Sequence, residues 1–146
     1  MSNAQRTRFK LIGIKTEQFA TFEEYLPKQD QSIELNAEIK QGVNSDDKII
    51  AIVPKFTFSV NGHVFLSLSI VVQYLIAPDD WRSFVDADQN IVIIPKDLLT
   101  HLGFLAVSTC RGTLHAKTEG TPFNHFLLPL IDVNQLIKED FVSALK

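Results

Sequence analysis

Apolar and polar residues alternate through most of the first half of the chain. From Ile33 to Lys40 every second residue is apolar, and the same alternation returns between Ile50 and Val60. A period of two is typical of a strand with one buried face. Pro54 interrupts the second run, so we expect that strand to lie at a sheet edge or to bend there.

A hairpin is predicted after this run, because Asn61–Gly62 is a strong turn signal. A two-residue turn would leave Leu66 and Leu68 on the polar face of the sheet. A three-residue loop instead pairs Phe58 with Leu66 and gathers the apolar residues on one face. Because a one-residue slip moves every side chain to the other face, we predict the three-residue loop. The opposite face is then polar and solvent-exposed, and it carries Lys55, Thr57, Ser59, Ser67 and Ser69.

The residues before Ile33 alternate less regularly. Phe9 and Leu11 share a face, and Gly13 then breaks the pattern, which indicates a strand with a bulge at the glycine. Together these runs predict a four-stranded antiparallel sheet with one apolar face.

The second half changes to a helical period. Pro95 is well placed in the first turn of a long helix, and Gly120 is well placed to end it. Leu98, Leu102 and Leu105 form one apolar stripe. A second stripe, rich in small residues, consists of Leu99, Gly103, Ala106, Cys110 and Leu114. Because a helix with two apolar stripes must bury both, we predict that the second stripe is an oligomer interface.

A last helix is predicted after Asp132, which is a good N-cap with Gln135 three residues later. Its apolar face would continue to Leu145, and residues 77–94 are expected to form a short helical turn and a loop. The predicted fold class is therefore α+β, with the long helix and the last helix packed on one face of the sheet.

Residues 120–131, "GTPFNHFLLPLI", link the two predicted helices. The segment is strongly apolar, yet two prolines exclude a helix or a central strand. One interpretation is that its side chains cover the core. The other is that they form, with the last helix, a groove for extended polypeptide. That groove would consist of Phe123, Phe126, Leu127, Leu128, Leu130, Ile131, Leu136 and Ile137.

Composition and charge narrow the class of protein. A length of 146 residues fits one domain, 1–146, and 45% hydrophobic residues are ordinary for a globular protein. A net charge of −3 gives no electrostatic footprint for nucleic acid. A single cysteine excludes an internal disulfide, and no apolar run reaches the length of a membrane span. We therefore expect a cytoplasmic protein.

Candidate chemistry is sparse. The sequence has no phosphate-binding loop and no zinc-binding helix motif, so we expect no cofactor, no metal and no enzymatic activity. Asp86-x-Asp88-x-Asn90 resembles the start of a calcium loop, but Ile91 stands where that loop requires glycine. Cys110 lies among apolar helix positions and is interpreted as inert. Its neighbour Arg111 is expected to pair with Glu119 or with a carboxylate of the sheet.

Several motifs follow in a recognisable order. Residues 90–95, "NIVIIP", precede the long helix, residues 120–123, "GTPF", open the apolar link, and residues 128–136, "LPLIDVNQL", lead into the last helix. In this order and spacing the chain resembles the protein-export chaperone SecB and its divergent relatives. The motifs cover about the last third of the chain. Arg111-Gly112-Thr113 lies well before Gly120, so the arginine of the family motif has no clear counterpart.

The resemblance implies a homo-oligomer, a dimer or a tetramer, whose apolar link and last helix bind non-native polypeptides without ATP. It also implies docking of the preprotein translocase motor on an acidic outer sheet. The modest net charge, the Ser/Thr-rich predicted outer face and the short C-terminus all depart from that pattern. A rival hypothesis is a dedicated interaction module that recognises one partner, such as an antitoxin-like protein.

Overall fold

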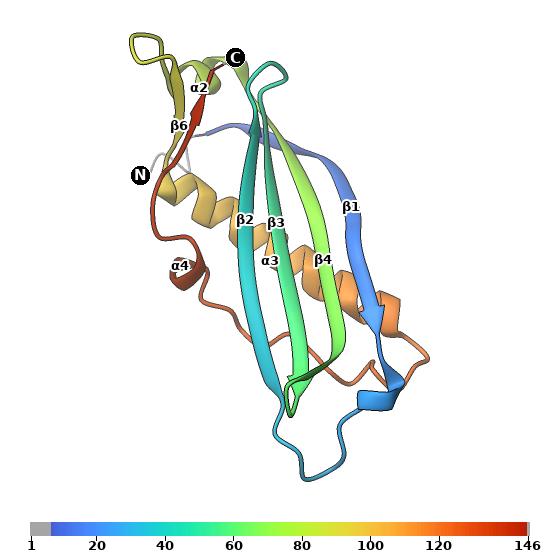
Figure 1. The fold of residues 1–146 in the computed structure, drawn as a ribbon. Helices are drawn as coiled ribbons and strands as arrows, with labels where there is room; N and C mark the ends of the chain where they lie inside the picture. Colours follow the sequence, from blue (N-terminus) through green and yellow to red (C-terminus); the bar gives the residue numbers. More distant parts are fainter. Residues whose placement is uncertain (1–6, 146) are drawn as a thin grey trace.

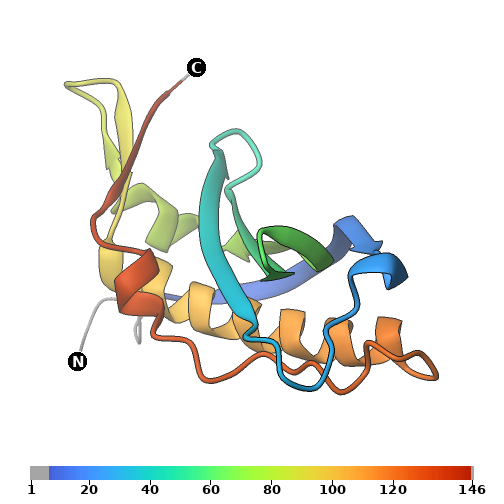
Figure 2. The same cartoon turned by 60° about the horizontal axis from the view of Figure 1, so that its bottom comes forward.

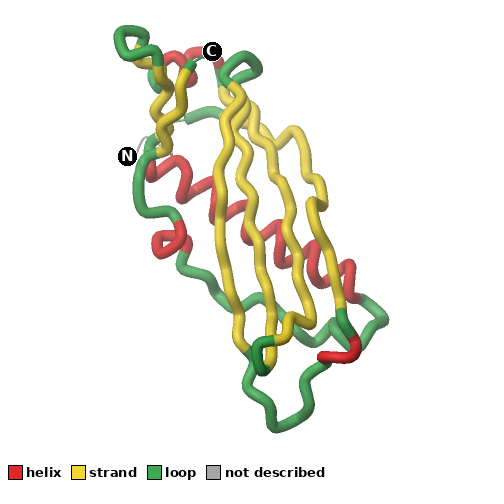
Figure 3. The backbone as a smooth tube through the Cα atoms, in the orientation of Figure 1, coloured by secondary structure: helices red, strands yellow, loops and turns green. Residues whose placement is uncertain are grey.

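The computed structural model describes residues 7–145, so residues 1–6 and 146 of the predicted domain lie outside it. The first half of the described chain forms one antiparallel sheet in the order β1-β4-β3-β2 (Figure 1, Figure 3). The elements are β1 Phe9–Thr21, the 3₁₀ helix η1 Glu23–Tyr25, β2 Glu34–Asn44, β3 Ile49–Val60 and β4 His63–Ile76. The predicted four-stranded antiparallel sheet is confirmed.

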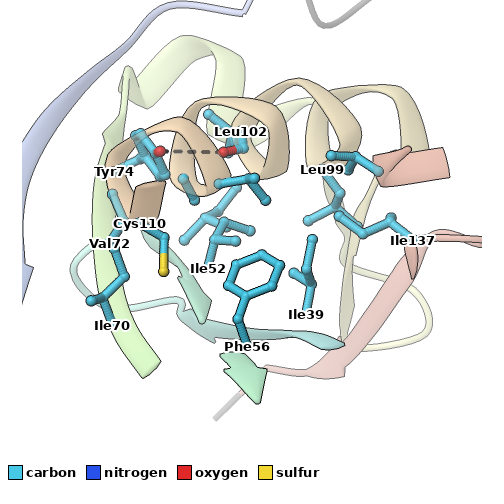
Figure 4. Packing of buried hydrophobic residues seen from close by; sticks show 14 of the residues in the cluster. Ile39, Ile52, Phe56, Ile70, Val72, Tyr74, Leu99, Leu102, Cys110 and Ile137 are labelled. Atoms are coloured by element: carbon cyan, nitrogen blue, oxygen red, sulfur yellow. Dashed lines mark hydrogen bonds between the residues drawn. The ribbon is translucent and has the colours of Figure 1, made fainter. Parts of the chain in front are cut away.

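One face of this sheet is apolar because the alternation of neighbouring strands is in register. Ala37 of β2 lies opposite Phe56 of β3, for example, so both side chains point to the same side. The helix α3, Lys96–Thr118, crosses this inner face diagonally (Figure 1). The core lies between them, and the Tyr74 hydroxyl of β4 donates a hydrogen bond of 3.2 Å to the Leu102 carbonyl oxygen of α3 (Figure 4).

The β3–β4 hairpin keeps the predicted register but not the predicted loop. Phe58 pairs with Leu66, as expected, yet Val60 pairs with His63 and leaves a two-residue turn. Asn61–Gly62 have positive φ angles of 50° and 79°, as a type I′ turn requires. The predicted three-residue loop is therefore wrong.

A β-bulge reconciles the turn with the apolar pattern. Ser59 pairs with Val64 and Phe58 with Leu66, so Phe65 is an extra residue without a partner in β3. Its side chain is fully buried, and its carbonyl oxygen accepts a hydrogen bond of 2.9 Å from the Phe22 backbone N–H. One inserted residue thus places the following leucines on the inner face.

β3 is an interior strand although it contains Pro54, so the predicted edge position is wrong. Pro54 pairs with Ile39 of β2, whereas the ladder to β4 has no pair between Ile52 and Lys55. Because proline lacks an N–H, the interrupted ladder places the missing donor on the β4 side. The cost of the proline is confined to that side of the strand.

β1 is irregular, as expected. Its register with β4 shifts between Leu11 and Gly13 and again between Thr16 and Gln18. The predicted bulge at Gly13 is confirmed. A Cβ atom at Gly13 would lie 2.9 Å from Oε1 of Gln73, so the glycine also permits a close approach of this side chain.

The outer face of the sheet is less exposed than predicted. Ser67 and Ser69 are buried, and the Ser69 hydroxyl donates a hydrogen bond of 2.9 Å to Oε1 of Glu17 in β1. Lys40 and Lys55 line the same small hollow as Glu17. The described outer face therefore carries charges of both signs at its centre instead of an acidic surface.

Residues 77–94 contain more structure than the predicted loop. The short helical turn is confirmed as α2, Pro78–Arg82. The rest of the segment forms the hairpin of β5, Val85–Asp86, and β6, Ile91–Ile94, which the sequence analysis missed. This hairpin belongs to a second antiparallel sheet with the order β5-β6-β7.

The last helix is much shorter than predicted. α4 spans Val133–Leu136, and the Asp132 side chain caps it by accepting a hydrogen bond of 3.1 Å from the Asn134 backbone N–H. The chain is extended after α4, and β7, Phe141–Ala144, pairs with β6. The predicted N-cap is confirmed, but the predicted extension of the last helix to Leu145 is wrong. The chain forms β7 instead, because pairing with β7 satisfies the backbone groups of β6 that would otherwise lack partners. None of the helices within residues 7–145 is both long and apolar enough to cross a membrane.

Candidate functional site

The segment between α3 and α4, residues 119–132, runs beneath the sheet from the end of α3 near η1 to α4 on the side of β2 (Figure 2). We call this segment the crossover. Gly120 has a φ of 78°, so the chain leaves the helical path there, as predicted. Tight turns follow, in which the backbone N–H groups of Asn124 and Phe126 donate to the carbonyl oxygens of Thr121 and Phe123. The remaining crossover residues up to Asp132 form no helix or strand.

Three of the eight residues predicted to line a polypeptide groove are sealed inside the core. Phe123, Leu128 and Ile137 expose 2%, 4% and 1% of their surface. They cannot contact another chain while the domain is folded, so for these residues the interpretation as a core cover is the correct one. The burial of Phe123 also makes it an unsuitable probe of binding, because its substitution would destabilise the fold.

The other predicted groove residues remain accessible. Leu130 is 97% exposed and Leu127 is 62% exposed, whereas Phe126, Ile131 and Leu136 are half-buried against the core. We call these five residues the crossover surface. The crossover surface therefore gathers accessible apolar side chains within one short stretch of the chain.

The crossover surface lies beside the free edge of the sheet. At one end the ring of Phe126 is 6.3 Å from that of Phe58, whose partner in the edge strand β2 is Leu35. At the other end α4 reaches β2, where Val133 and Ile39 both approach Gly103 of α3. Apolar side chains and an open strand edge are therefore available together, which is the combination that extended peptides use.

Two contacts fix the course of the crossover. Nε of Arg111 donates a hydrogen bond of 3.2 Å to the Leu128 carbonyl oxygen, and Nη2 of Arg111 donates one of 2.9 Å to the Pro129 carbonyl oxygen. The bulged Phe65 packs its ring 4.9 Å from that of Phe126. The expected pairing of Arg111 with a carboxylate is thus replaced by bonds to backbone. No pattern in the sequence indicates this role, because carbonyl acceptors are present at every residue.

The stripe predicted as an oligomer interface is buried within the chain. Leu99, Ala106 and Cys110 have no exposed surface, Leu114 is 2% exposed, and Gly103 is buried. A Cβ atom at Gly103 would lie 2.8 Å from Cδ1 of Ile137 and 3.0 Å from Cγ1 of Val133. The small residues therefore admit α4 and the segment after it, and they are not accessible to a second copy while this segment stays in place.

The face of α3 that remains free is a different one. His101, Phe104, Ser108 and Gly112 are exposed along it, and Phe104 is 61% exposed. We call these four residues the free face of α3. They follow one another at spacings of three or four residues, so they form a continuous line on the helix surface.

The described residues offer little that could carry out catalysis. Burial raises the pKa of the Cys110 thiol to about 12, with the nearby Arg111 acting in the opposite direction, so this thiol is protonated and inert at neutral pH. Burial also raises the pKa of Tyr74 to about 12. Within residues 7–145 no three His, Cys, Asp or Glu residues are grouped as metal ligands. Asp86 instead accepts a hydrogen bond of 3.2 Å from the Gln89 N–H in the β5–β6 turn.

Comparison with known proteins identifies the fold. No sequence family and no curated protein matches the chain. Among solved structures it is similar to the SecB-like chaperone Rv1957 of Mycobacterium tuberculosis in complex with a ChAD peptide from the Rv1956 HigA1 antitoxin. The identity is 9% and the TM-score 0.53, over 85% of this chain and 91% of that one. A protein of unknown function from Streptococcus agalactiae matches at 13% identity and a TM-score of 0.37, over 86% and 98% of the two chains.

The likeness to Rv1957 supports the predicted architecture of a four-stranded antiparallel sheet with a long helix on one face. The chain has a SecB-like α+β fold.

Proposed function

We propose that this protein binds exposed apolar segments of non-native polypeptides and thereby acts as an ATP-independent chaperone. The observation that carries the proposal is the crossover surface, where Leu127 and Leu130 are exposed between Phe126, whose ring lies near that of Phe58, and α4, which contacts the edge strand β2. The binding involves no chemical step. Because burial of apolar surface is not directional, such a site would select for hydrophobicity more than for sequence.

The size of the surface suits moderate affinity. Each large apolar side chain that a client buries contributes about 1.5–3 kcal/mol, from which the cost of ordering the client is subtracted. Micromolar binding corresponds to about −8 kcal/mol, so several such side chains are needed together. A client segment must therefore be several residues long and locally unfolded.

A second candidate function is recognition of one dedicated partner through the same surface. It is favoured by the similar structure of Rv1957, which holds a peptide from an antitoxin. The two candidates share the site and differ in selectivity. A general chaperone would delay aggregation of several unrelated unfolded proteins, whereas a dedicated module would act on one.

Self-association and a link to protein export are separate parts of the proposal. The free face of α3 supports self-association, because Phe104 is a large apolar side chain left uncovered by the chain itself. Docking of a translocase motor would have to use the outer face of the sheet, where lysines and glutamates are mixed. Direct binding of the purified motor to this protein would test that docking independently of client binding.

The central experiment compares a double leucine variant of the crossover surface with a single leucine variant elsewhere. The double variant Leu127→Ser, Leu130→Ser should stay folded, because both side chains are exposed, and should bind a permanently unfolded protein at least tenfold more weakly. Leu11→Ser is the matched control, since Leu11 of β1 is 52% exposed at the opposite sheet edge. Fluorescence anisotropy with a reduced and alkylated labelled protein gives the affinities. If the double variant and the control bind equally well, the crossover surface is not the site.

A further inference from the structure

β2 and β7 are edge strands of two different sheets, and the C-terminal ends of these two strands line opposite sides of one hollow. β2 ends the order β1-β4-β3-β2 and β7 ends the order β5-β6-β7. A hollow of about 270 Å³ lies between them, lined by Val43, Asn44, Ser45 and Asp46 on one side and by Ser143 and Ala144 on the other. Figure 1 shows both strands running toward the same end of the molecule. The residues that line the hollow belong to the C-terminal ends of both strands and to the turn after β2.

The ladders show which backbone groups of β7 point into the gap. The Leu145 N–H donates to the Asn90 carbonyl oxygen, so these residues form a hydrogen-bonded pair directly after the last pair of the β6–β7 ladder, Ile91 and Ala144. Bonded and non-bonded pairs alternate in antiparallel strands, so Ser143 is also bonded to β6. The backbone groups of Val142 and Ala144 therefore point away from β6 and toward the gap.

Pro54 gives the corresponding assignment for β2. The backbone nitrogen of Pro54, which carries no hydrogen, faces β4. Pro54 and its partner Ile39 therefore form a non-bonded pair of the β2–β3 ladder. Ile39 therefore turns its own N–H and C=O to the free edge, and by alternation Gln41 and Val43 do the same. None of the backbone hydrogen bonds outside the ladders of residues 7–145 involves β2 or residues 141–144.

We infer that one extended segment of a partner polypeptide binds as a β-strand in the gap between β2 and β7 and joins the two sheets. Because β2 and β7 run in the same direction, a single strand can be antiparallel to both. Alternate residues of this strand would bond to Gln41 and Val43 on one side and to Val142 and Ala144 on the other. The inference rests on the proposed function and specifies how the bound polypeptide is held.

A single strand fits this gap better than a second copy of the sheet does. The edge of another copy would bring its own neighbouring strand into the space that β7 occupies. A lone segment has no such neighbour, and it satisfies both open edges at once. Beyond the gap the same segment would continue along β2 past the crossover surface, where its apolar side chains could contact Ile131 and Leu136.

Amide hydrogen exchange tests the inference with the full-length protein labelled with ¹⁵N. The probe is a reduced and alkylated globular protein that stays unfolded, at a concentration that saturates binding measured by anisotropy. Exchange of the Gln41, Val43, Val142 and Ala144 amides should slow at least tenfold. The Gly42 and Ser143 amides, which already donate within the ladders, should change less than twofold.

A pair of variants at one position provides a second test. Val142→Pro removes an outward N–H and no ladder donor, and it should weaken probe binding at least tenfold. Val142→Ala keeps that N–H and should bind within twofold of the natural protein. Equal binding by both variants, or equal loss in both, would contradict strand pairing. The exchange measurement needs no variant, so it decides the matter even if Val142→Pro unfolds.

The remaining outcomes separate the two proposals. If the probe binds and the four outward amides exchange as before, strand addition is wrong and the proposed function stands. If no unfolded probe and no single partner binds, both are wrong. If the outward amides slow with rising protein concentration and without probe, a second copy occupies the gap, which also overturns the inference.

Discussion

α3 and the crossover lie side by side under the same sheet, yet they treat their apolar residues differently. α3 hides nearly all of them, and Phe104 is the one large apolar side chain that this fully described helix exposes strongly. The crossover is shorter and exposes both Leu127 and Leu130. A helix fixes which positions share a face, whereas an irregular chain can turn each residue separately toward the core or toward solvent. Regular structure therefore gives this domain stability, and the irregular link gives it accessible apolar surface.

The largest effect should separate the two kinds of crossover residue. Phe123→Ala empties a buried site and should lower the free energy of unfolding by about 3–5 kcal/mol, whereas Leu130→Ala should change it by less than about 0.5 kcal/mol. Urea denaturation followed by circular dichroism measures both. Similar values for the two variants would contradict the division of the crossover into sealed and exposed residues.

The next effect concerns the two glycines of α3. Gly103→Leu must displace Ile137 and Val133 and should destabilise the protein by about 1–3 kcal/mol. A Cβ atom at Gly112 would meet nothing within 4 Å, and Gly112→Leu should stabilise the protein by up to about 1 kcal/mol through helix propensity. Thermal unfolding of both variants checks the sign. A stabilised Gly103→Leu would mean that α4 does not pack on this stripe.

A charge on each exposed surface should separate self-association from client binding. Phe104→Glu should weaken self-association about tenfold and leave binding of an unfolded probe unchanged. Leu130→Glu should do the reverse. Sedimentation velocity and anisotropy measure the two properties on the same samples. If one substitution affects both properties equally, the free face of α3 and the crossover surface belong to one interface.

The smallest effect concerns the hydrogen bonds that join α3 to the crossover. Arg111→Met keeps the length of the side chain and removes both hydrogen bonds to the crossover carbonyls, at a cost of about 1 kcal/mol. Limited proteolysis should then cut the crossover faster, while the melting of α3 changes little. An unchanged cleavage rate would show that these bonds do not restrain the segment.

The four strands and the long helix are predictable because side-chain period reports them directly. Ile33 to Lys40 alternate in β2, and Leu98 and Leu102 recur at helical spacing. The end of the chain is not predictable in this way, because Ile137, Phe141 and Leu145 fit a helix as well as they fit β7. Pairing with β6 decides the outcome, and that pairing depends on a strand about 50 residues earlier.

The candidate site was predicted as a segment but not residue by residue. The composition of residues 120–131 indicates an apolar crossover, and Gly120 marks its start. Which residues it hides depends on Arg111 and Phe65, whose contacts join positions far apart in the sequence. The small stripe of α3 shows the same limit, since the pattern indicates close packing but not whether the partner is α4 or another copy.

The bulge in β4 has a consequence beyond the hairpin that it corrects. Phe65 has no opposite residue in β3, yet its ring supports Phe126, which lies 61 positions further along the chain. Deleting Phe65 would leave a regular hairpin with a two-residue turn. It would also remove the aromatic ring that packs against Phe126 near the start of the crossover. A relative that lacks the insertion would have to hold its crossover in another way, so the length of this hairpin is a marker to compare when the fold is met again.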